Sequence, residues 1–274
     1  MTATVALVRG DRSVQTVQKA LNLIGGVEHL SGRPVLIKVN FIGTKKWDSG
    51  ATTDPIVTEA LIQMIQQSNR DVYVVESDST FTNATKAAEA TGTRELCVKY
   101  GVPFLNLSDL SEKVTVRLDG AETLKDITIP KLVTTSLVVS AAKMKTHEST
   151  GVTLGLKNMF GLLPDKFKMK YHARNISKVV VDINRVVAPS LTVIDGFVGM
   201  EGSGPVHGIP IKMDLIIAGR DVVATDAVAA RAMGFDPHEI YHIRRAAELK
   251  IGLMDDVKIV GESLESVSRE FRRG

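Results

Sequence analysis

The residues with the clearest capacity for chemistry lie in a basic segment that follows an apolar run. Lys143, Lys145 and His147 alternate, and Lys157-Asn158 lies in an apolar, glycine-punctuated stretch. Alternating side chains of an extended backbone share one side, so the first three should face a common site. A histidine exchanges protons near neutral pH, and a desolvated lysine can be a nucleophile, tether or anion partner. We predict catalytic roles for His147 and Lys157, and anion or cofactor binding by Lys143, Lys145, Lys157 and Asn158. The alternative is a solvated basic surface with a structural histidine.

A second histidine, His172, closes a charge run at 166–170 and flanks Lys157 from the other side in sequence. Two imidazoles and an amine could converge there, and a histidine can also bind a metal. The charge run is interpreted as a solvated or anion-facing mobile segment. His238 and His242 have a metal-compatible spacing of four residues. No acidic residue completes a zinc-protease pattern, so we predict that these two lie at the surface.

Polar residues also gather after other expected strands. Lys38 and Asn40 close the second strand, where a buried lysine needs a counter-charge or ligand, and a solvated edge is the alternative. The loop at 76–83 could bind a cation or hydroxyl groups, or supply helix caps. Gly202 and Gly204 lie in a glycine-rich loop that could direct backbone N–H groups toward an anion, or form only a sharp turn. We predict cofactor binding by Lys38, Asn40, Gly202 and Gly204. The sequence contains neither a dinucleotide-binding fingerprint nor a P-loop.

The composition bounds the class of protein. With 274 residues, 44% of them apolar, the chain can bury a full core without disulfides or metals. The net charge of +3 does not indicate nucleic-acid binding, but positions 143–178 have a local net charge of +6 that attracts anions. The single cysteine, Cys97, can hold no iron–sulfur cluster by itself, and we expect it to be buried. No apolar run reaches the length of a membrane span, so we expect a cytoplasmic protein.

Apolar runs alternate with helical patterns along the chain. The first strands are expected at 4–9, 35–40, 72–76 and 101–106. This alternation favours an α/β fold with a mostly parallel, doubly wound, Rossmann-like sheet. Looser alternation with turn residues at about 112–130 predicts a small antiparallel β-hairpin insertion. Later strands are expected at 136–142, 191–195, 213–218 and 257–260, and later helices at 176–187 and 221–233. No linker or repeat is visible, so residues 1–274 are predicted to form a single α/β domain.

These motifs together resemble the DUF362 family, a group of largely uncharacterised prokaryotic proteins. The resemblance runs through most of the chain and is carried by Lys38-Val-Asn40, Pro130, Lys143-Met-Lys-Thr-His147, Thr153-Leu-Gly-Leu-Lys-Asn158, Gly161, Ile194-Asp-Gly196, Glu201-Gly-Ser-Gly-Pro205, Asp221 and Asp226. Many members carry a ferredoxin-like cluster module, which implies electron transfer. This chain departs from them because Cys97 is its one cysteine, so no intrinsic iron–sulfur cluster is expected.

A more distant resemblance is to the lactate-racemase family that uses a nickel-pincer nucleotide. There the cofactor is tethered to a lysine, a histidine ligates nickel, and other histidines act as acid and base. His147, Lys157 and His172 occur in a similar order. The resemblance implies that Lys157 is the tether, His172 the nickel ligand and His147 a proton-transfer residue. A clear counterpart of the second catalytic histidine is missing, because the first half contains only His29.

The predicted function is that of an enzyme, isomerase or racemase-like or redox-associated, which binds a small anionic metabolite or phosphorylated cofactor in a basic cleft. His147 would transfer protons, and Lys143, Lys145 and Lys157 would hold the anion. The alternative is an electron-transfer or docking partner without its own cluster, in which the lysines at 166–170 form a surface for an acidic redox protein. Neither nucleic acid nor a membrane is expected as a partner.

Overall fold

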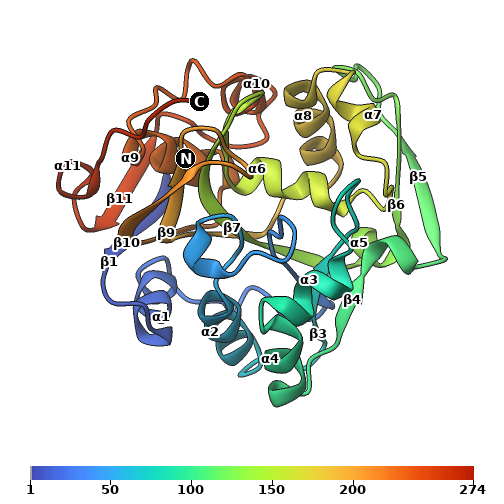
Figure 1. Ribbon diagram of the computed structural model, residues 1–274, viewed down its shortest axis with the longest axis horizontal. Coiled ribbons are helices and arrows are strands. Elements are labelled where there is room, and N and C mark those ends of the chain that lie inside the picture. The colour runs from blue at the N-terminus through green and yellow to red at the C-terminus, as the bar shows by residue number, and fades with distance from the viewer. Residues whose placement is uncertain (1) are drawn as a thin grey trace.

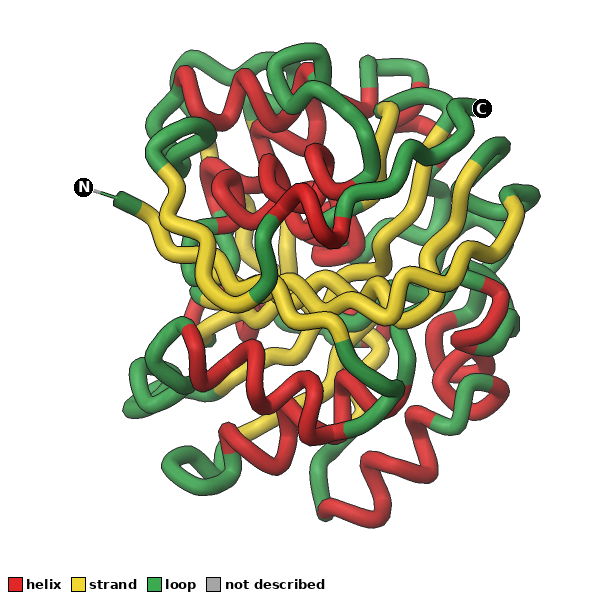
Figure 2. Tube along the Cα trace, turned by 90° about the vertical axis from the view of Figure 1, so that its left-hand side faces the viewer, coloured by secondary structure: helices red, strands yellow, loops and turns green. Residues whose placement is uncertain are grey.

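Within residues 2–274, which the computed structural model describes, nine strands form one central sheet. These strands are β1 (Ala3–Arg9), β2 (Val35–Lys38), β3 (Val72–Glu76), β4 (Phe104–Asn106), β7 (Leu137–His147), β8 (Gly151–Thr153), β9 (Leu191–Glu201), β10 (Ile209–Gly219) and β11 (Val257–Gly261) (Figure 1). Their order across the sheet is β11-β1-β10-β9-β7-β2-β3-β4, and β8 pairs with β7. Helices lie on both sides of the strands, as Figure 2 shows.

Most neighbouring strands run parallel. The strands β9, β7, β2, β3 and β4 share one direction, whereas β10 is antiparallel to both β1 and β9. The predicted α/β class with a mostly parallel sheet is therefore confirmed. Strand β7 lies inside the parallel part, between β9 and β2, and all its residues after Leu137 are buried, as expected of a parallel strand covered on both faces.

The helices begin where the sequence provides caps. Asp54 accepts the N–H of Ile56 ahead of Pro55, and Ser13 accepts the N–H of Thr16. The helices are α1 (Val14–Leu23), α2 (Pro55–Ile65), α3 (Ala84–Ala90), α4 (Thr93–Tyr100), α5 (Lys131–Thr135), α6 (Gly155–Asn158), α7 (Met169–His172), α8 (Ile176–Val186), α9 (Val222–Ala232), α10 (Tyr241–Glu248) and α11 (Leu264–Val267). Short 3₁₀ turns lie at Trp47–Ser49, Leu107–Asp109 and Met159–Leu162.

The predicted insertion is a two-stranded antiparallel hairpin, β5 (Lys113–Arg117) and β6 (Asp126–Pro130), separate from the main sheet. Its loop is held from α8 by the buried carboxylate of Asp182. That carboxylate accepts the backbone N–H groups of Glu122, Thr123 and Leu124 at 2.7–2.8 Å. The hairpin thus packs beside α8 without extending the central sheet.

The expected glycine loop after residue 195 is shorter than the sequence indicated. Strand β9 continues to Glu201, and β10 already begins at Ile209. A Cβ at Gly196 would lie 2.8 Å from the Leu215 carbonyl oxygen, and one at Gly199 would lie 2.9 Å from that of Met144. The glycines expected in a loop are therefore needed for close strand packing.

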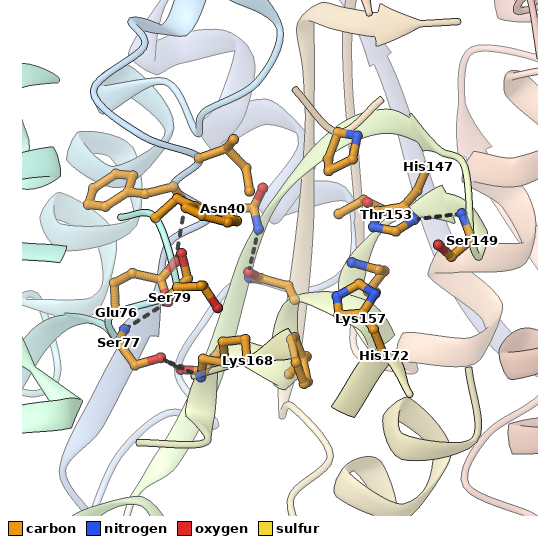
Figure 3. Close-up of a pocket in the computed structure, with 18 of the residues that line it drawn as sticks. Asn40, Glu76, Ser77, Ser79, His147, Ser149, Thr153, Lys157, Lys168 and His172 are labelled. Atoms are coloured by element: carbon orange, nitrogen blue, oxygen red, sulfur yellow. Dashed lines mark hydrogen bonds between the residues drawn. The ribbon is translucent and has the colours of Figure 1, made fainter. Parts of the chain in front are cut away.

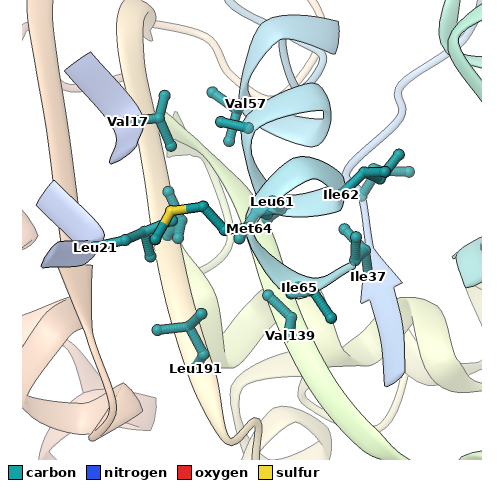
Figure 4. Packing of buried hydrophobic residues seen from close by; sticks show 14 of the residues in the cluster. Val17, Leu21, Ile37, Val57, Leu61, Ile62, Met64, Ile65, Val139 and Leu191 are labelled. Atoms are coloured by element: carbon teal, nitrogen blue, oxygen red, sulfur yellow. The ribbon is translucent and has the colours of Figure 1, made fainter. Parts of the chain in front are cut away.

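The core on one face of the sheet is formed by α1 and α2. Figure 4 shows these helices packed on β2, β7 and β9 through buried apolar side chains: Val17, Leu21, Val57, Leu61, Ile65, Ile37, Val139 and Leu191. Burying a side chain of this size contributes about 1.5–3 kcal/mol. Cys97 is 2% exposed and belongs to the same cluster, which confirms that it is buried. This packing supports the strand ends that form the site.

Candidate functional site

A cavity of about 350 Å³ lies where the carboxyl ends of β2, β3 and β7 meet α6 and α7 (Figure 3). Ligand sites of parallel α/β sheets commonly occupy this position. The polar side chains that line it come from five separate stretches of the chain: Lys38, Asn40, Glu76, Ser77, Ser79, Thr80, His147, Glu148, Ser149, Thr153, Lys157, Asn158, Lys168 and His172. The apolar lining consists mainly of Phe41, Ile42, Phe81, Phe160, Met169 and Pro205.

His147 ends β7 and has a defined tautomer. Its Nδ1 accepts the backbone N–H of Ser149 at 3.1 Å, so in the neutral ring the proton resides on Nε2. The ring edge opposite Ser149 faces the cavity (Figure 3). Burial, and then the charge of Lys157, lowers the pKa of His147 to about 2. At neutral pH this residue therefore presents an N–H donor to the cavity.

His172, on α7, lies beside His147, with ring centroids 6.3 Å apart and ring planes at 17°. It also packs edge-on against Phe160. Burial, with a smaller effect of Lys157, lowers the pKa of His172. The two imidazoles predicted to flank Lys157 thus line the same cavity as its amine.

Lys157 lies on the short helix α6, whose first turn is held by a side chain of α9. The buried carboxylate of Asp226 on α9 accepts the N–H groups of Gly155 and Leu156 at 2.7 and 2.8 Å. The amine of Lys157 forms no hydrogen bond or ion pair with the described residues. Burial, and then the charge of Lys38, lowers the pKa of Lys157 to about 8.

Lys38 is fully buried, and Glu76 supplies the counter-charge that a buried lysine requires, at 2.7 Å. Its ammonium group also donates to the Val39 carbonyl and to Oδ1 of Asn158. Asn40 donates to the same Asn158 oxygen at 3.2 Å. Asn158 in turn donates to the Lys38 carbonyl at 2.9 Å, which ties α6 to the end of β2.

Lys168 is not solvated, contrary to one of the two interpretations of the charge run at 166–170. Its side chain is buried and donates to Oγ of Ser77 at 3.0 Å and to the Leu163 carbonyl, as Figure 3 shows for Ser77. Lys166 is 66% exposed and lies 3.3 Å from Asp78, so neighbouring lysines face opposite environments. Burial is the main cause that lowers the pKa of Lys168 to about 7.

Four predicted binding residues lie outside the cavity lining. Lys143 pairs with the buried carboxylate of Asp195 at 2.8 Å, and Lys145 donates to the Ala51 carbonyl at 2.7 Å. They alternate with His147 as expected, but a carboxylate of β9 and a carbonyl of the loop after β2 bind their ammonium groups. Gly202 and Gly204 lie in the turn after β9, where the Gly202 carbonyl accepts a hydrogen bond from the Thr146 hydroxyl group. Only the adjoining Pro205 reaches the cavity.

His242 was predicted at the surface, and this prediction is wrong. The residue is fully buried on α10, and neither ring nitrogen has a hydrogen-bond partner among residues 2–274. Burial, and then the charge of Lys157, lowers its pKa to about 3. The apolar neighbours Ile240 and Ile243, interrupted by a histidine, were a weak signal for burial. His238, by contrast, is exposed and approaches Asp255.

The predicted caps at the start of α9 have separate roles. Asp221 accepts the N–H groups of Val223 and Ala224 and so caps α9, as expected. Asp226 instead caps α6, a contact between segments 70 residues apart that no local pattern indicates. In the loop after β3, Asn83 caps α3 by accepting the N–H of Lys86.

Together the fold and the cavity define a mixed α/β protein with a lysine- and histidine-lined site at the carboxyl ends of parallel strands. Residues 35–231 match the family described as "Domain of unknown function (DUF362)", and the chain belongs to this family. The matched segment contains every residue that lines the cavity. The chain is also similar to thylakoid-associated protein sll1697 of Synechocystis sp., with 27% identity over 246 residues that cover 87% of this chain and 74% of that protein.

Two kinds of feature are missing from the part of the chain that the structure describes. No helix within residues 2–274 has the length and apolar content needed to cross a membrane. The same residues contain no group of three or more histidine, cysteine, aspartate or glutamate side chains arranged to hold a metal ion.

Proposed function

We propose that this protein is an enzyme that binds a small anionic molecule in the cavity and transfers protons through His147. The observation that carries the proposal is the convergence of Lys157, His147 and His172 on one cavity of about 350 Å³. Lysine and histidine side chains with shifted pKa values that line one cavity are typical of sites for small charged substrates.

The charge balance supports an anion as the ligand. Lys38 is paired with Glu76, whereas Lys157 and Lys168 form no ion pair within the described chain. Burying unpaired ammonium groups is unfavourable, and a bound carboxylate or phosphate would supply the missing counter-charge. Three lining atoms also lack any partner within residues 2–274: Asn40 Oδ1, Thr80 Oγ1 and Thr153 Oγ1. Such buried polar atoms are available to a ligand.

The role of His147 follows from its tautomer. The Ser149 N–H occupies Nδ1, so Nε2–H can donate to a substrate oxygen and stabilise negative charge that develops there. Once that proton has been transferred, the same nitrogen can accept one on the return step. Lys168, together with Lys157 while its amine is protonated, would hold the anionic group and keep the substrate oriented during this exchange.

Anion binding can be tested with a matched pair of variants. Sulfate should raise the thermal midpoint of the wild-type protein and of Lys166→Met, because Lys166 is 66% exposed outside the cavity. Lys168→Met should lose most of this effect, since it removes a buried cavity ammonium. Equal sulfate effects in the three proteins would contradict an anion site at the cavity.

Proton transfer can be tested by NMR in D₂O with small 2-hydroxy and 2-oxo acids. The wild-type protein should catalyse exchange of the C3 hydrogens of a 2-oxo acid or of the C2 hydrogen of a 2-hydroxy acid, and His147→Gln should lose that exchange. His238→Gln is the control, because His238 is exposed and far along the chain from the cavity residues. Exchange that survives in His147→Gln would remove His147 from the proposed mechanism.

The resemblance to the nickel-pincer lactate-racemase family gives one specific form of this proposal. The tether and the imidazole ligand that it implies, Lys157 and His172, both line the cavity. When bound, such a group would supply the metal chemistry, and the donors beyond His172 would belong to the cofactor. Stoichiometric nickel and a mass increase on Lys157, after expression with cofactor-making proteins, would support this form. Unmodified Lys157 without nickel would exclude it.

A docking function is the second candidate, favoured by exposed side chains of the cavity lining and of the segment at 166–170. Phe81, which lines the cavity, is 88% exposed, Phe167 is 61% exposed, and Lys166 and Lys170 lie near Phe167 in the sequence. The similar cyanobacterial protein is named as thylakoid-associated. For the docking function we therefore propose an acidic partner that is located at a membrane, whereas the sequence led us to expect a cytoplasmic protein. The variant Lys166→Glu/Lys170→Glu should weaken salt-sensitive binding of an acidic ferredoxin. Unchanged binding would argue against docking through this surface.

A further inference from the structure

The amine of Lys157 differs from the other cationic groups of the cavity because it has no partner. Lys38 is held by Glu76, and Lys168 is held by Ser77 and the Leu163 carbonyl. No residue of the described chain donates to or accepts from the Lys157 amine. Its helix is nevertheless fixed, since Asp226 accepts two backbone N–H groups of α6. The backbone of Lys157 is therefore fixed, whereas its amine is free to meet a ligand.

The environment of Lys157 increases the fraction of its amine that is uncharged at neutral pH. Burial and the nearby charge of Lys38 lower the pKa of Lys157 to about 8. At pH 7 roughly one tenth of such an amine is free, against about 0.03% for an ordinary lysine, which is roughly a 300-fold difference. The free amine is the nucleophilic form.

We infer that Lys157 forms an imine with a small carbonyl compound that carries a carboxylate or phosphate group. This inference rests on the proposed function, because it uses the same cavity and the same preference for anions. It goes beyond that function by naming a covalent step and the chemical class of the substrate, which is a 2-oxo acid or a phosphorylated aldehyde.

The step balances without an oxidant or reductant. The lone pair of the Lys157 nitrogen forms a bond to the carbonyl carbon, and the carbonyl electron pair moves onto oxygen. His147 Nε2–H stabilises the negative charge of this oxygen by a hydrogen bond. One proton of the attacking nitrogen moves to the oxygen and gives a carbinolamine. The second nitrogen proton then moves to the hydroxyl group, which leaves as water, and a carbon–nitrogen double bond remains.

The anionic group of the substrate is held apart from the reacting carbon. Lys168 lines the same cavity from the segment before α7, and Ser77 holds it there at 3.0 Å (Figure 3). A lysine that forms an ion pair with the substrate stays charged, whereas Lys157 must lose its proton to react. The cavity thus offers one lysine for charge and one for covalent chemistry.

Borohydride trapping followed by peptide mapping tests this inference directly. The protein would be mixed with pyruvate, with glyceraldehyde 3-phosphate or with the uncharged acetone, and then reduced. Intact mass of the untreated protein first shows whether Lys157 is unmodified. The expected result is one adduct per chain, located on Lys157, for at least one anionic carbonyl compound and at least tenfold less for acetone. Which of the two anionic compounds reacts distinguishes the carboxylate from the phosphate class.

Two variants provide the matched comparison. Lys157→Met should abolish the adduct, and Lys19→Met, an exposed helical lysine on α1, should leave it unchanged. If Lys157→Met does not fold, the peptide map of the wild-type protein still decides the question. Adducts spread over exposed lysines with no excess on Lys157, or a permanent modification on Lys157 in the purified protein, would overturn the inference.

Failure of the inference can be told apart from failure of the proposed function. Sulfate binding that depends on Lys168, without an adduct on Lys157, would leave the anion site in place and remove the covalent step. An adduct on Lys157 that forms equally well with acetone would remove the anion requirement and with it the inference. The absence of both sulfate binding and an adduct would remove both.

Discussion

The buried ion pair between Lys38 and Glu76 leads to a quantitative prediction for Glu76→Gln. The two charges lie 2.7 Å apart, with side chains 1% and 6% exposed. Glutamine keeps the shape of the side chain but removes the counter-charge, so the Lys38 ammonium would be buried without a partner. Removing one member of a buried pair typically costs about 3–5 kcal/mol. For a chain of this size the loss corresponds to a fall in the thermal midpoint of roughly 6–20 °C.

The pH dependence of this loss has a defined sign. Burial lowers the pKa of Lys38, and Glu76 opposes that shift. Without Glu76 the pKa falls further, so the folded variant binds fewer protons than the unfolded chain. Stability of Glu76→Gln therefore rises as pH rises toward the ordinary lysine pKa near 10.5. The deficit relative to wild type should be greatest near neutral pH and smaller at pH 9–10.

Urea denaturation followed by circular dichroism measures the free energies of unfolding. The proteins compared are the wild type, Glu76→Gln, Lys38→Met and the double variant Lys38→Met/Glu76→Gln. The double variant should be more stable than Glu76→Gln alone, because it removes the unpaired buried charge. A double variant that loses the full sum of the two single losses would refute the reasoning. So would a Glu76→Gln variant within about 0.5 kcal/mol of wild type, the usual range for surface substitutions.

Three further predictions follow from the cavity and its supports. His242→Leu should be neutral or stabilising by up to about 1–3 kcal/mol in urea denaturation, because both buried ring nitrogens lack partners; clear destabilisation would reveal a partner for the imidazole. Asp226→Ala should cost roughly 2–6 kcal/mol, because it leaves two buried N–H groups of α6 unsatisfied. The more conservative Asp226→Asn should recover part of that loss, and equal stability of the two variants would contradict this account. Sulfate binding, measured by calorimetry, should weaken as pH rises from 6 to 9, because Lys168 with a pKa of about 7 and Lys157 with a pKa of about 8 lose their charges; binding that is constant over this range would exclude these lysines as the anion partners.

Much of the fold could be predicted because its signals are local. Apolar runs marked β3 and β11, and Asp54-Pro55 marked the start of α2, since strand burial and helix capping depend on neighbouring residues. The length of β9 was missed because glycine suits both a loop and a strand that another backbone approaches closely. At Gly199 the deciding contact is the Met144 carbonyl, which is distant in sequence.

Only part of the candidate site could be predicted from the sequence. His147, Lys157 and His172 were chosen for their types and order, and the structure brings them to one cavity. Lys143 and Lys145 have the same alternation as His147, yet Asp195 and the Ala51 carbonyl hold them away from that cavity. Alternation along a strand defines a face, but it does not define what covers that face at each position.

The sequence by itself determined the α/β class and the basic segment that provides the site. Only the tertiary structure decided which of the lysines are free to meet a ligand. Lys168 turns inward from a charge run, His242 is buried without partners, and Lys157 is left unpaired beside His147. The physical reason is that burial and pairing of a charged side chain depend on segments far apart in the chain, which meet only when the sheet and its covering helices have packed.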